Sequence, residues 1–218
     1  MIKNFQNNKF NFSNAYIHIK RNKEAILIDT AASGEKIINY CIDHDIKIKY
    51  VLLTHNHLDH VIDLDKIIAK FNPIIYINQN DFLGLFDPKI NRSFFANLDW
   101  KLKNKDNIIS FAANSKQKIN LLGINIKIIP VSGHTAGSTF YLFDNQDIFI
   151  GDTLFLKGIG MHQKELKVDL KKFMRSIKFI YHLAKENDYL IYPGHYQSGF
   201  RIKDIDLNLN SELKEILR

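Results

Sequence analysis

The chain is poor in cysteine and lacks any long apolar run. Cys41 is the single cysteine among 218 residues, which excludes an intramolecular disulfide and suits a reducing compartment. The opening residues "MIKNFQNNKFNFSNAY" contain no continuous apolar segment of signal-peptide length, and no later run approaches a membrane span. The sequence therefore predicts a cytoplasmic protein without a membrane partner.

Low-complexity blocks, heptad runs and short repeats are absent as well, so disorder is not the expected state. Hydrophobic residues make up 45% of the chain and aromatic residues 12%, enough apolar surface for a buried core. This length fits a single domain over residues 1–218. We expect that domain to have two pseudo-symmetric halves, about 1–115 and 116–218, that share one site.

The net charge of +7 raises the question of a nucleic-acid partner. Lysine is abundant throughout the chain, and no stretch resembles a recurring basic nucleic-acid-binding motif. The runs "ELKVDLKKFMRSIK" and "KLKNK" are interpreted as solvated faces. A small-molecule substrate is therefore the expected partner, and nucleic acid is the alternative.

Five apolar runs of strand length end in a residue that can bind or orient a metal. Their isoleucine, valine, leucine and aromatic content is typical of β-strands, and their near-continuous hydrophobicity indicates burial on both faces. The runs are "AILIDT" ending at Asp29, "YVLLTHNH" at His55 and His57, "IKIIPVSGHT" at His134, "DIFIGDT" at Asp152 and "YLIYPGH" at His195.

Helical patterns lie between these runs. Residues 35–45 read as a helix that buries Cys41 as a small core residue. Helical spacing also places Val61, Leu64, Ile68 and Phe71 on one face of a helix over 59–71, and Leu170, Phe173, Ile177 and Ile180 on one face over 169–184. Strands covered by helices predict a layered α/β domain.

Polar residues that follow strand ends converge at the rim of a sheet. His55 and His57 can turn two imidazoles toward one ion, whereas the following Asp59 and His60 diverge toward a second. Seven candidate ligands are too many for one tetrahedral ion, and three nitrogens with an open position are typical of catalytic zinc. The other histidines, His18, His44, His162 and His182, are interpreted as ordinary core or surface groups. The seven candidates are His55, His57, Asp59, His60, His134, Asp152 and His195.

The motifs "THNHLDH", "SGHTAGST", "GDTLF" and "YPGH", with "LIDT" before them, resemble the metallo-β-lactamase superfamily from about residue 14 to 200. The resemblance implies a four-layer αββα sandwich with two metals at one edge of the sheets. It also implies that Asp29 orients the ligand loop from outside. The implied ligands are His55, His57 and His134 for the first metal, Asp59, His60 and His195 for the second, and Asp152 between both.

Within this superfamily, "GDTLF" and "LFDPKINRS" resemble the small glyoxalase-II-like hydrolases, which cleave thioesters. A metal-activated water would attack the carbonyl, and Asp59 would orient that water or accept its proton. Two divalent ions are expected, zinc first, since imidazole and carboxylate also accept iron or manganese. The alternatives are a nuclease and a mononuclear iron persulfide dioxygenase that uses the positions of His55, His134 and Asp152.

The expected substrate is an anionic thioester or ester, with Lys157 or Arg201 as candidates for holding its charge. Each of these two cations also fits a solvated surface position. The chain departs from the family pattern around the substrate pocket, for example where Gly160 is followed by Met161. No candidate ligand is a cysteine, which argues against the antibiotic-cleaving β-lactamases that place a thiolate at the second metal.

Overall fold

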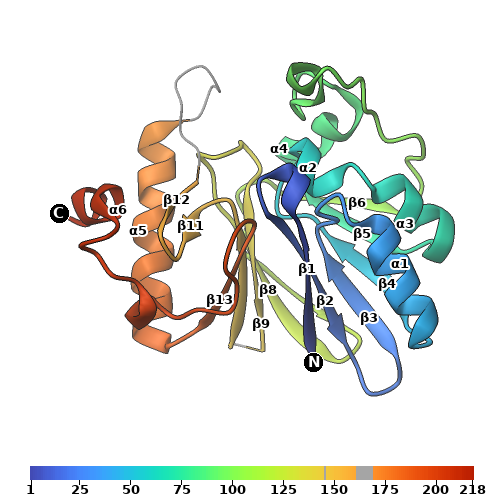
Figure 1. The fold of residues 1–218 in the computed structure, drawn as a ribbon, viewed down its shortest axis with the longest axis horizontal. Helices are drawn as coiled ribbons and strands as arrows, with labels where there is room; N and C mark the ends of the chain where they lie inside the picture. Colours follow the sequence, from blue (N-terminus) through green and yellow to red (C-terminus); the bar gives the residue numbers. More distant parts are fainter. Residues whose placement is uncertain (145, 161–168) are drawn as a thin grey trace.

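The structure, a computed structural model, describes residues 1–144, 146–160 and 169–218. Two sheets pack face to face, and helices cover the outer face of each sheet (Figure 1). This arrangement confirms the predicted four-layer αββα sandwich. The covering helices are α1 (Gly34–Asp43) and α3 (Leu64–Phe71) on the first sheet, and α5 (Leu170–Asn187) and α6 (Ser211–Leu217) on the second.

The first sheet is built from the N-terminal part of the chain, and its strands lie side by side in sequence order. The first three strands pair antiparallel, whereas the third to the sixth pair parallel. The parallel strands therefore end at one edge. The strands are β1 (Ile2–Asn7), β2 (Ser13–Ile19), β3 (Glu24–Ile28), β4 (Lys47–Leu52), β5 (Ile74–Asn78) and β6 (Ile108–Phe111).

The second sheet has the strand order β13-β10-β9-β8-β7. Both β8 and β10 pair antiparallel with β9, and β13 pairs parallel with β10, so β8, β10 and β13 run in the same direction. Their carboxyl ends thus share one edge. The strands are β7 (Gln117–Leu121), β8 (Ile124–Pro130), β9 (Thr139–Phe143), β10 (Asp147–Gly151) and β13 (Leu190–Pro193). Between β10 and β13 in the chain, β11 (Leu154–Phe155) and β12 (Gly158–Ile159) form a small separate hairpin.

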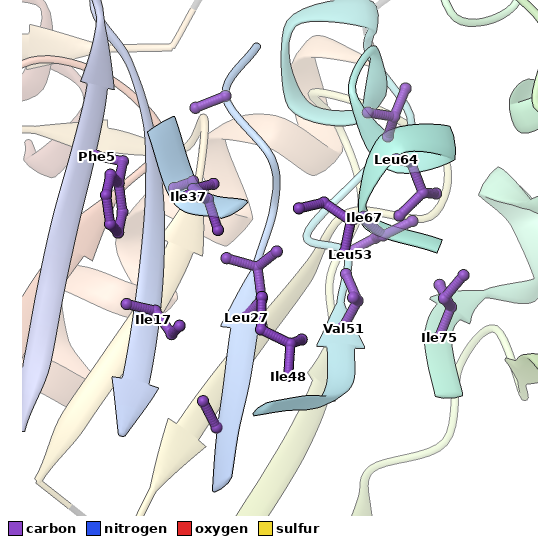
Figure 2. Packing of buried hydrophobic residues seen from close by; sticks show 14 of the residues in the cluster. Phe5, Ile17, Leu27, Ile37, Ile48, Val51, Leu53, Leu64, Ile67 and Ile75 are labelled. Carbon is purple, nitrogen blue, oxygen red and sulfur yellow. The ribbon is translucent and has the colours of Figure 1, made fainter. Parts of the chain in front are cut away.

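Strand β3 shows why the apolar runs are nearly continuous. Ala25 and Leu27 pack in the cluster beneath α1 and α3, while Ile26 and Ile28 pack between the two sheets. Figure 2 shows Leu27 among the residues that join this sheet to its helices. Burying each such aliphatic side chain contributes about 1.5–3 kcal/mol. The prediction of strands buried on both faces is confirmed for β3.

The helix predicted over 59–71 is interrupted. It is divided into α2 (Leu58–Val61) and α3, and directly before α3 the buried Asp63 carboxylate accepts a hydrogen bond from the Gly34 backbone N–H at 2.8 Å. This bond fixes the start of α1 against the start of α3. Val61 and Leu64 of the predicted apolar face are buried, and Ile68 and Phe71 are partly buried against the same core. Ile67, which was not predicted, is fully buried as well.

The helix predicted over 169–184 is confirmed as α5, with Phe173, Ile177 and Ile180 buried. Leu170, predicted on the same face, is 45% exposed in the first turn of the helix. Short helical turns complete the described structure: η1 (Asn8–Phe10), α4 (Gln79–Phe82), η2 (Leu83–Phe86), η3 (Ser93–Ala96) and η5 (Ile202–Asp204).

Cys41 lies in α1 and is 1% exposed, as predicted for a core residue. Burial raises the pKa of its thiol to about 12, so it stays a thiol near neutral pH. Within residues 1–144, 146–160 and 169–218, the helices are too short or too polar to cross a bilayer. The cytoplasmic location and the division into halves at about residue 115 stay predictions.

Candidate metal centre

The predicted ligands meet at one edge of the sandwich because each follows the carboxyl end of a strand. Asp29 follows β3, and His55 comes three residues after the neighbouring parallel strand β4. Asp152 directly follows β10, and His195 comes two residues after β13, its parallel neighbour. His134 follows β8 in the same sheet. The fold thus gathers side chains from distant parts of the sequence.

One group consists of His55, His57 and His134, whose side chains are all buried. His57 Nδ1 lies 3.1 Å from His55 Nε2 and 2.9 Å from His134 Nε2. Ligand atoms on a tetrahedral zinc ion, at 2.0–2.1 Å from it, lie about 3.3 Å apart. The three ring nitrogens therefore converge with the spacing that a single ion needs.

A second group consists of Asp59, His60 and His195. Asp59 Oδ2 lies 3.5 Å from His60 Nε2 and 3.1 Å from His195 Nε2. Two imidazoles and a carboxylate form an oxygen–nitrogen donor set that suits zinc, iron or manganese. This group draws on α2 and on the loop after β13, so both sheets supply it.

Asp152 lies between the two groups. Its Oδ1 is 3.3 Å from His60 Nε2, and its Oδ2 is 3.6 Å from His134 Nε2 and 3.1 Å from His195 Nε2. Asp152 Oδ1 and His60 Nε2 are nevertheless buried without a hydrogen-bond partner. Buried polar atoms without partners are costly. Cations between them would satisfy both atoms, and the donor set therefore fits a pair of ions.

A hydrogen-bond chain orients His55. The Thr54 hydroxyl donates to Asp29 Oδ2 at 2.7 Å, and the Thr54 backbone N–H donates to Asp29 Oδ1 at 2.8 Å. Because its proton is directed to Asp29, the Thr54 oxygen accepts from His55 Nδ1 at 3.1 Å. This leaves the lone pair of His55 Nε2 facing the other two histidines. Asp29 acts here as the outer positioning group.

His60 and His195 are oriented in the same way. His60 Nδ1 donates to Asp29 Oδ2 at 2.9 Å, and His195 Nδ1 donates to the Asn11 carbonyl oxygen at 2.8 Å. Since neither acceptor can donate, the Nδ1 atoms carry the protons and both Nε2 atoms face the cluster. The short segment around η1 thereby fixes a residue that lies 184 positions later in the chain.

The two groups differ electrostatically. Burial lowers the pKa of His55 and His57 well below the ordinary value, and it lowers the pKa of His134 to about 4. Burial would also lower the pKa of His195, but the Asp152 and Asp59 carboxylates raise it to about 10. The first group is thus neutral and ready to donate lone pairs, whereas the second holds protons that ions would displace.

Gly194 in "YPGH" is required by close packing. A Cβ atom at this position would overlap the Asp152 carboxylate and lie 2.8 Å from His60 Cε1. Any larger residue would push the carboxylate out of place. The glycine therefore allows His195 and Asp152 to come within hydrogen-bond distance.

Asp81, in α4, ties the two loops that carry the first group. Its carboxylate accepts hydrogen bonds from the Asn56 N–H at 3.2 Å, the Thr135 hydroxyl at 2.7 Å and the Gly137 N–H at 2.8 Å. Asn56 separates His55 from His57, and Thr135 follows His134. Asp81 is 1% exposed, and burial raises its pKa to about 6.

We expect Asp81→Ala to lower the free energy of unfolding by about 2–4 kcal/mol, because it leaves buried donors without an acceptor. It should also weaken metal retention, since the His55–His57 and His134 loops lose their shared anchor. Urea unfolding and metal titration measure the two effects, and Asp81→Asn should lose less of each. An unchanged unfolding midpoint and metal affinity in Asp81→Ala would contradict the positioning role.

Comparison with known families identifies the superfamily. A family model described as the metallo-beta-lactamase superfamily matches residues 9–195. The chain belongs to this superfamily. The matched segment contains all seven predicted ligands, and the predicted family is confirmed.

Relatives in the superfamily carry hydrolase names. A probable metallo-hydrolase of Streptococcus pyogenes is 28% identical over 82% of this chain and 77% of its own length. A probable polyketide biosynthesis zinc-dependent hydrolase of Bacillus subtilis is 27% identical over 84% and 73%. A hydroxyacylglutathione hydrolase of Glaesserella parasuis is 29% identical over 68% and 53%, so this chain matches about half of that relative.

Solved superfamily structures share the fold. The BLEG-1 B3 metallo-beta-lactamase has a TM-score of 0.84 at 23% identity, over 98% of this chain and 99% of its own. TTHA1623 in a di-iron-bound form has a TM-score of 0.74 at 21% identity, over 92% and 95%. At these identities the likeness shows the fold alone.

A cavity of about 930 Å³ opens onto the cluster. Several predicted ligands line it, among them His57, Asp59 and Asp152. Apolar side chains form much of the remaining wall, namely Leu58, Ala96, Phe155, Leu156 and Ile159, and the cationic side chains Lys9, Arg92 and Lys157 also line it. Its size is that of a small-molecule site.

The two cations predicted to hold the charge of the substrate, Lys157 and Arg201, lie in different surroundings. Lys157 lines the cavity, whereas Arg201 forms an ion pair with Asp188 at 3.2 Å and is not among the described lining residues. Met161 and His162 lie outside the described residues. Arg92 and Lys9 were not predicted; Arg92 stands inside the motif "LFDPKINRS", but nothing in that pattern indicates where its side chain lies.

The histidines predicted to be ordinary groups are His18, His44, His162 and His182. Of the three in the described chain, His44 and His182 are exposed and His18 packs against Phe143 with ring centroids 5.6 Å apart. None of the three belongs to a potential metal-ligand group among the described residues. Their interpretation as core or surface groups therefore agrees with the structure.

Proposed function

We propose that the chain is a dinuclear metal-dependent hydrolase that cleaves a thioester. The observation that carries this proposal is the pair of ligand groups on either side of Asp152, opening onto one cavity. His55, His57 and His134 would hold the first ion, and Asp59, His60 and His195 the second, with Asp152 shared. The similarity to hydroxyacylglutathione hydrolases supports the reaction class.

Divalent ions at these positions would supply Lewis acidity, which would lower the pKa of water and polarise a carbonyl oxygen. The chain's own residues set the geometry. Asp152 lies 3.3 Å from His60 and 3.1 Å from His195, and Asp59 lines the cavity next to both histidines. Asp59 is therefore placed to orient the attacking water and to accept its proton. The water oxygen forms the new C–O bond, the C–S bond breaks, and the thiolate leaves with the bonding electrons.

Zinc is the preferred ion, because three imidazoles with an open position form a catalytic zinc arrangement. Iron and manganese suit the same donors. One relative is named as zinc-dependent and one structural neighbour is di-iron-bound. A mononuclear iron dioxygenase needs a single ion. The second group of Asp59, His60 and His195 favours two ions instead.

The experiment combines elemental analysis of the purified protein with turnover of lactoylglutathione and of a simpler thioester. We expect two metal ions per chain and release of free thiol from at least one of these substrates. One iron per chain with oxygen uptake on a persulfide would replace this proposal with the dioxygenase. Cleavage of RNA without thioester turnover would replace it with the nuclease.

A further inference from the structure

Three cationic side chains line the cavity in the described part of the chain, and they differ in burial. Lys9 and Lys157 are exposed, whereas Arg92 is half-buried beside the ligand groups. A guanidinium is more weakly hydrated than an ammonium and pairs with carboxylates through two parallel hydrogen bonds. Arg92 is therefore the cation best suited to recognise an anion inside this cavity.

The backbone at Arg92 is fixed to the ligand loop. The Leu58 N–H, between the predicted ligands His57 and Asp59, donates to the Asn91 carbonyl oxygen at 2.8 Å. The Asn91 side chain in turn donates to the Gly84 carbonyl oxygen at 2.8 Å and accepts from the Ser93 N–H at 2.9 Å. Arg92 therefore directly follows a residue whose backbone is hydrogen-bonded to the segment that carries the predicted ligands His57 and Asp59.

Arg92 adopts a backbone conformation that arginine disfavours. Its φ of 70° lies in the left-handed region, which costs an ordinary residue about 1–2 kcal/mol relative to the right-handed one. Glycine or asparagine would occupy the position at lower cost. Strained residues persist where the surrounding structure holds them, and they cluster at ligand sites.

Arg92 lines the same cavity as His57 and His134 of the first group and Asp59 and His195 of the second. Burial lowers the pKa of its guanidinium, while the Asp152 and Asp59 carboxylates act in the opposite direction. The guanidinium stays charged at physiological pH. An anion bound to Arg92 would therefore share this cavity with a substrate at the proposed metal centre.

We propose that Arg92 is a specificity-determining residue that binds a carboxylate of the substrate, a few bonds from the scissile thioester. The apolar wall formed by Leu156, Ile159 and their neighbours accommodates the uncharged remainder. This inference rests on the proposed thioesterase function and narrows its substrate class to thioesters that carry a carboxylate on the acyl or the thiol side.

The test uses matched substrate pairs. One pair is the acetyl thioester of 3-mercaptopropionate and that of 3-mercaptopropionamide; the other is the ethanethiol monothioester of glutarate and that of glutaramate. We expect wild type to prefer the carboxylate member of at least one pair. Arg92→Gln should raise KM for that member by about ten- to a hundred-fold, since hydrogen bonds to charged groups are worth this factor. The amide member should change by less than about three-fold in kcat/KM.

Controls separate charge recognition from folding. Arg92→Lys should recover part of the preference, and Lys89→Gln, on the same segment but with an exposed side chain over Phe94, should match wild type. Metal content and thermal melting of each variant check the fold. Equal losses on both members of a pair, or a preference that survives Arg92→Gln, would overturn the proposal for Arg92.

A binding measurement distinguishes this proposal from the proposed function. Calorimetry with 3-(ethylthio)propionate and its amide, which are thioethers that cannot be hydrolysed, reports recognition without turnover. Carboxylate-dependent binding that is lost in Arg92→Gln would support the role of Arg92, whether or not a thioester is cleaved. Absence of thioester cleavage together with such binding would count against the proposed thioesterase function and not against Arg92. Equal binding of acid and amide by wild type would overturn the role of Arg92.

Discussion

Asp152→Ala is expected to abolish hydrolysis, with a loss of at least about a thousand-fold in kcat/KM, or about 4 kcal/mol of transition-state stabilisation. Its carboxylate lies within 3.1–3.6 Å of His60, His134 and His195, so alanine removes an acidic partner of both ligand groups at once. Metal content should fall together with activity. Steady-state kinetics and elemental analysis of the same preparation measure both effects.

Asp106→Ala is the matched control for this substitution, because Asp106 is exposed on a loop away from the cluster. It should leave kcat/KM and metal content unchanged. An Asp152→Ala protein that retains two ions and full activity would contradict the shared role of this carboxylate. Loss of activity with intact metal content would restrict the role to the chemical step.

His57→Ala is expected to abolish activity as well. His57 Nδ1 lies about 3 Å from both His55 Nε2 and His134 Nε2, so its removal takes one of three converging nitrogens away from the first group. The loss of a ligand weakens metal retention as well as turnover. Metal titration of the variant, followed by kinetics at saturating metal, separates the two effects.

His182→Ala provides the control, since His182 is exposed on α5 and lies outside the cluster. We expect its turnover to remain within about three-fold of wild type, as is usual for surface substitutions. Wild-type activity in His57→Ala without added metal would show that the histidine triplet is not the centre of the chemistry.

The convergence of the predicted ligands could be anticipated because each segment that carries them has a local signature. An apolar run followed by "HNH", "GH" or "GD" marks the end of a buried strand, and "HLDH" places Asp59 in the first turn of a helix. Parallel pairing of β3 with β4 and of β10 with β13 then brings these ends to one edge. Sequence pattern and sheet topology together determine where the polar side chains meet.

The interruption of the predicted helix over 59–71 could not be read from periodicity. At the interruption Asp63 accepts a hydrogen bond from Gly34, 29 residues away, a contact that local spacing does not indicate. Leu170 matches the helical spacing of its neighbours but lies in the first turn of α5, where it is exposed. In both places helical spacing alone does not determine the outcome.

Arg92 and Asp81 escaped prediction for a related reason. Arg92 lies within "LFDPKINRS", but this pattern does not indicate where its side chain lies, and Asp81 belongs to no motif recognised in the sequence. Asp81 meets Thr135 across 54 residues, and the Arg92 segment is held by the tether between Asn91 and Leu58. A residue that positions predicted ligands, such as Asp81, or that is proposed to recognise the substrate, such as Arg92, can be identified only when the structure of the loops is known.

The most direct test of the account is a crystal structure of the metal-loaded protein with anomalous scattering to locate the ions. We expect two ions within about 4 Å of each other, one on His55, His57 and His134 and the other on Asp59, His60 and His195. The Asp152 carboxylate should contact both ions. A single ion, or two ions bound away from these side chains, would contradict the dinuclear centre on which the proposed hydrolysis depends.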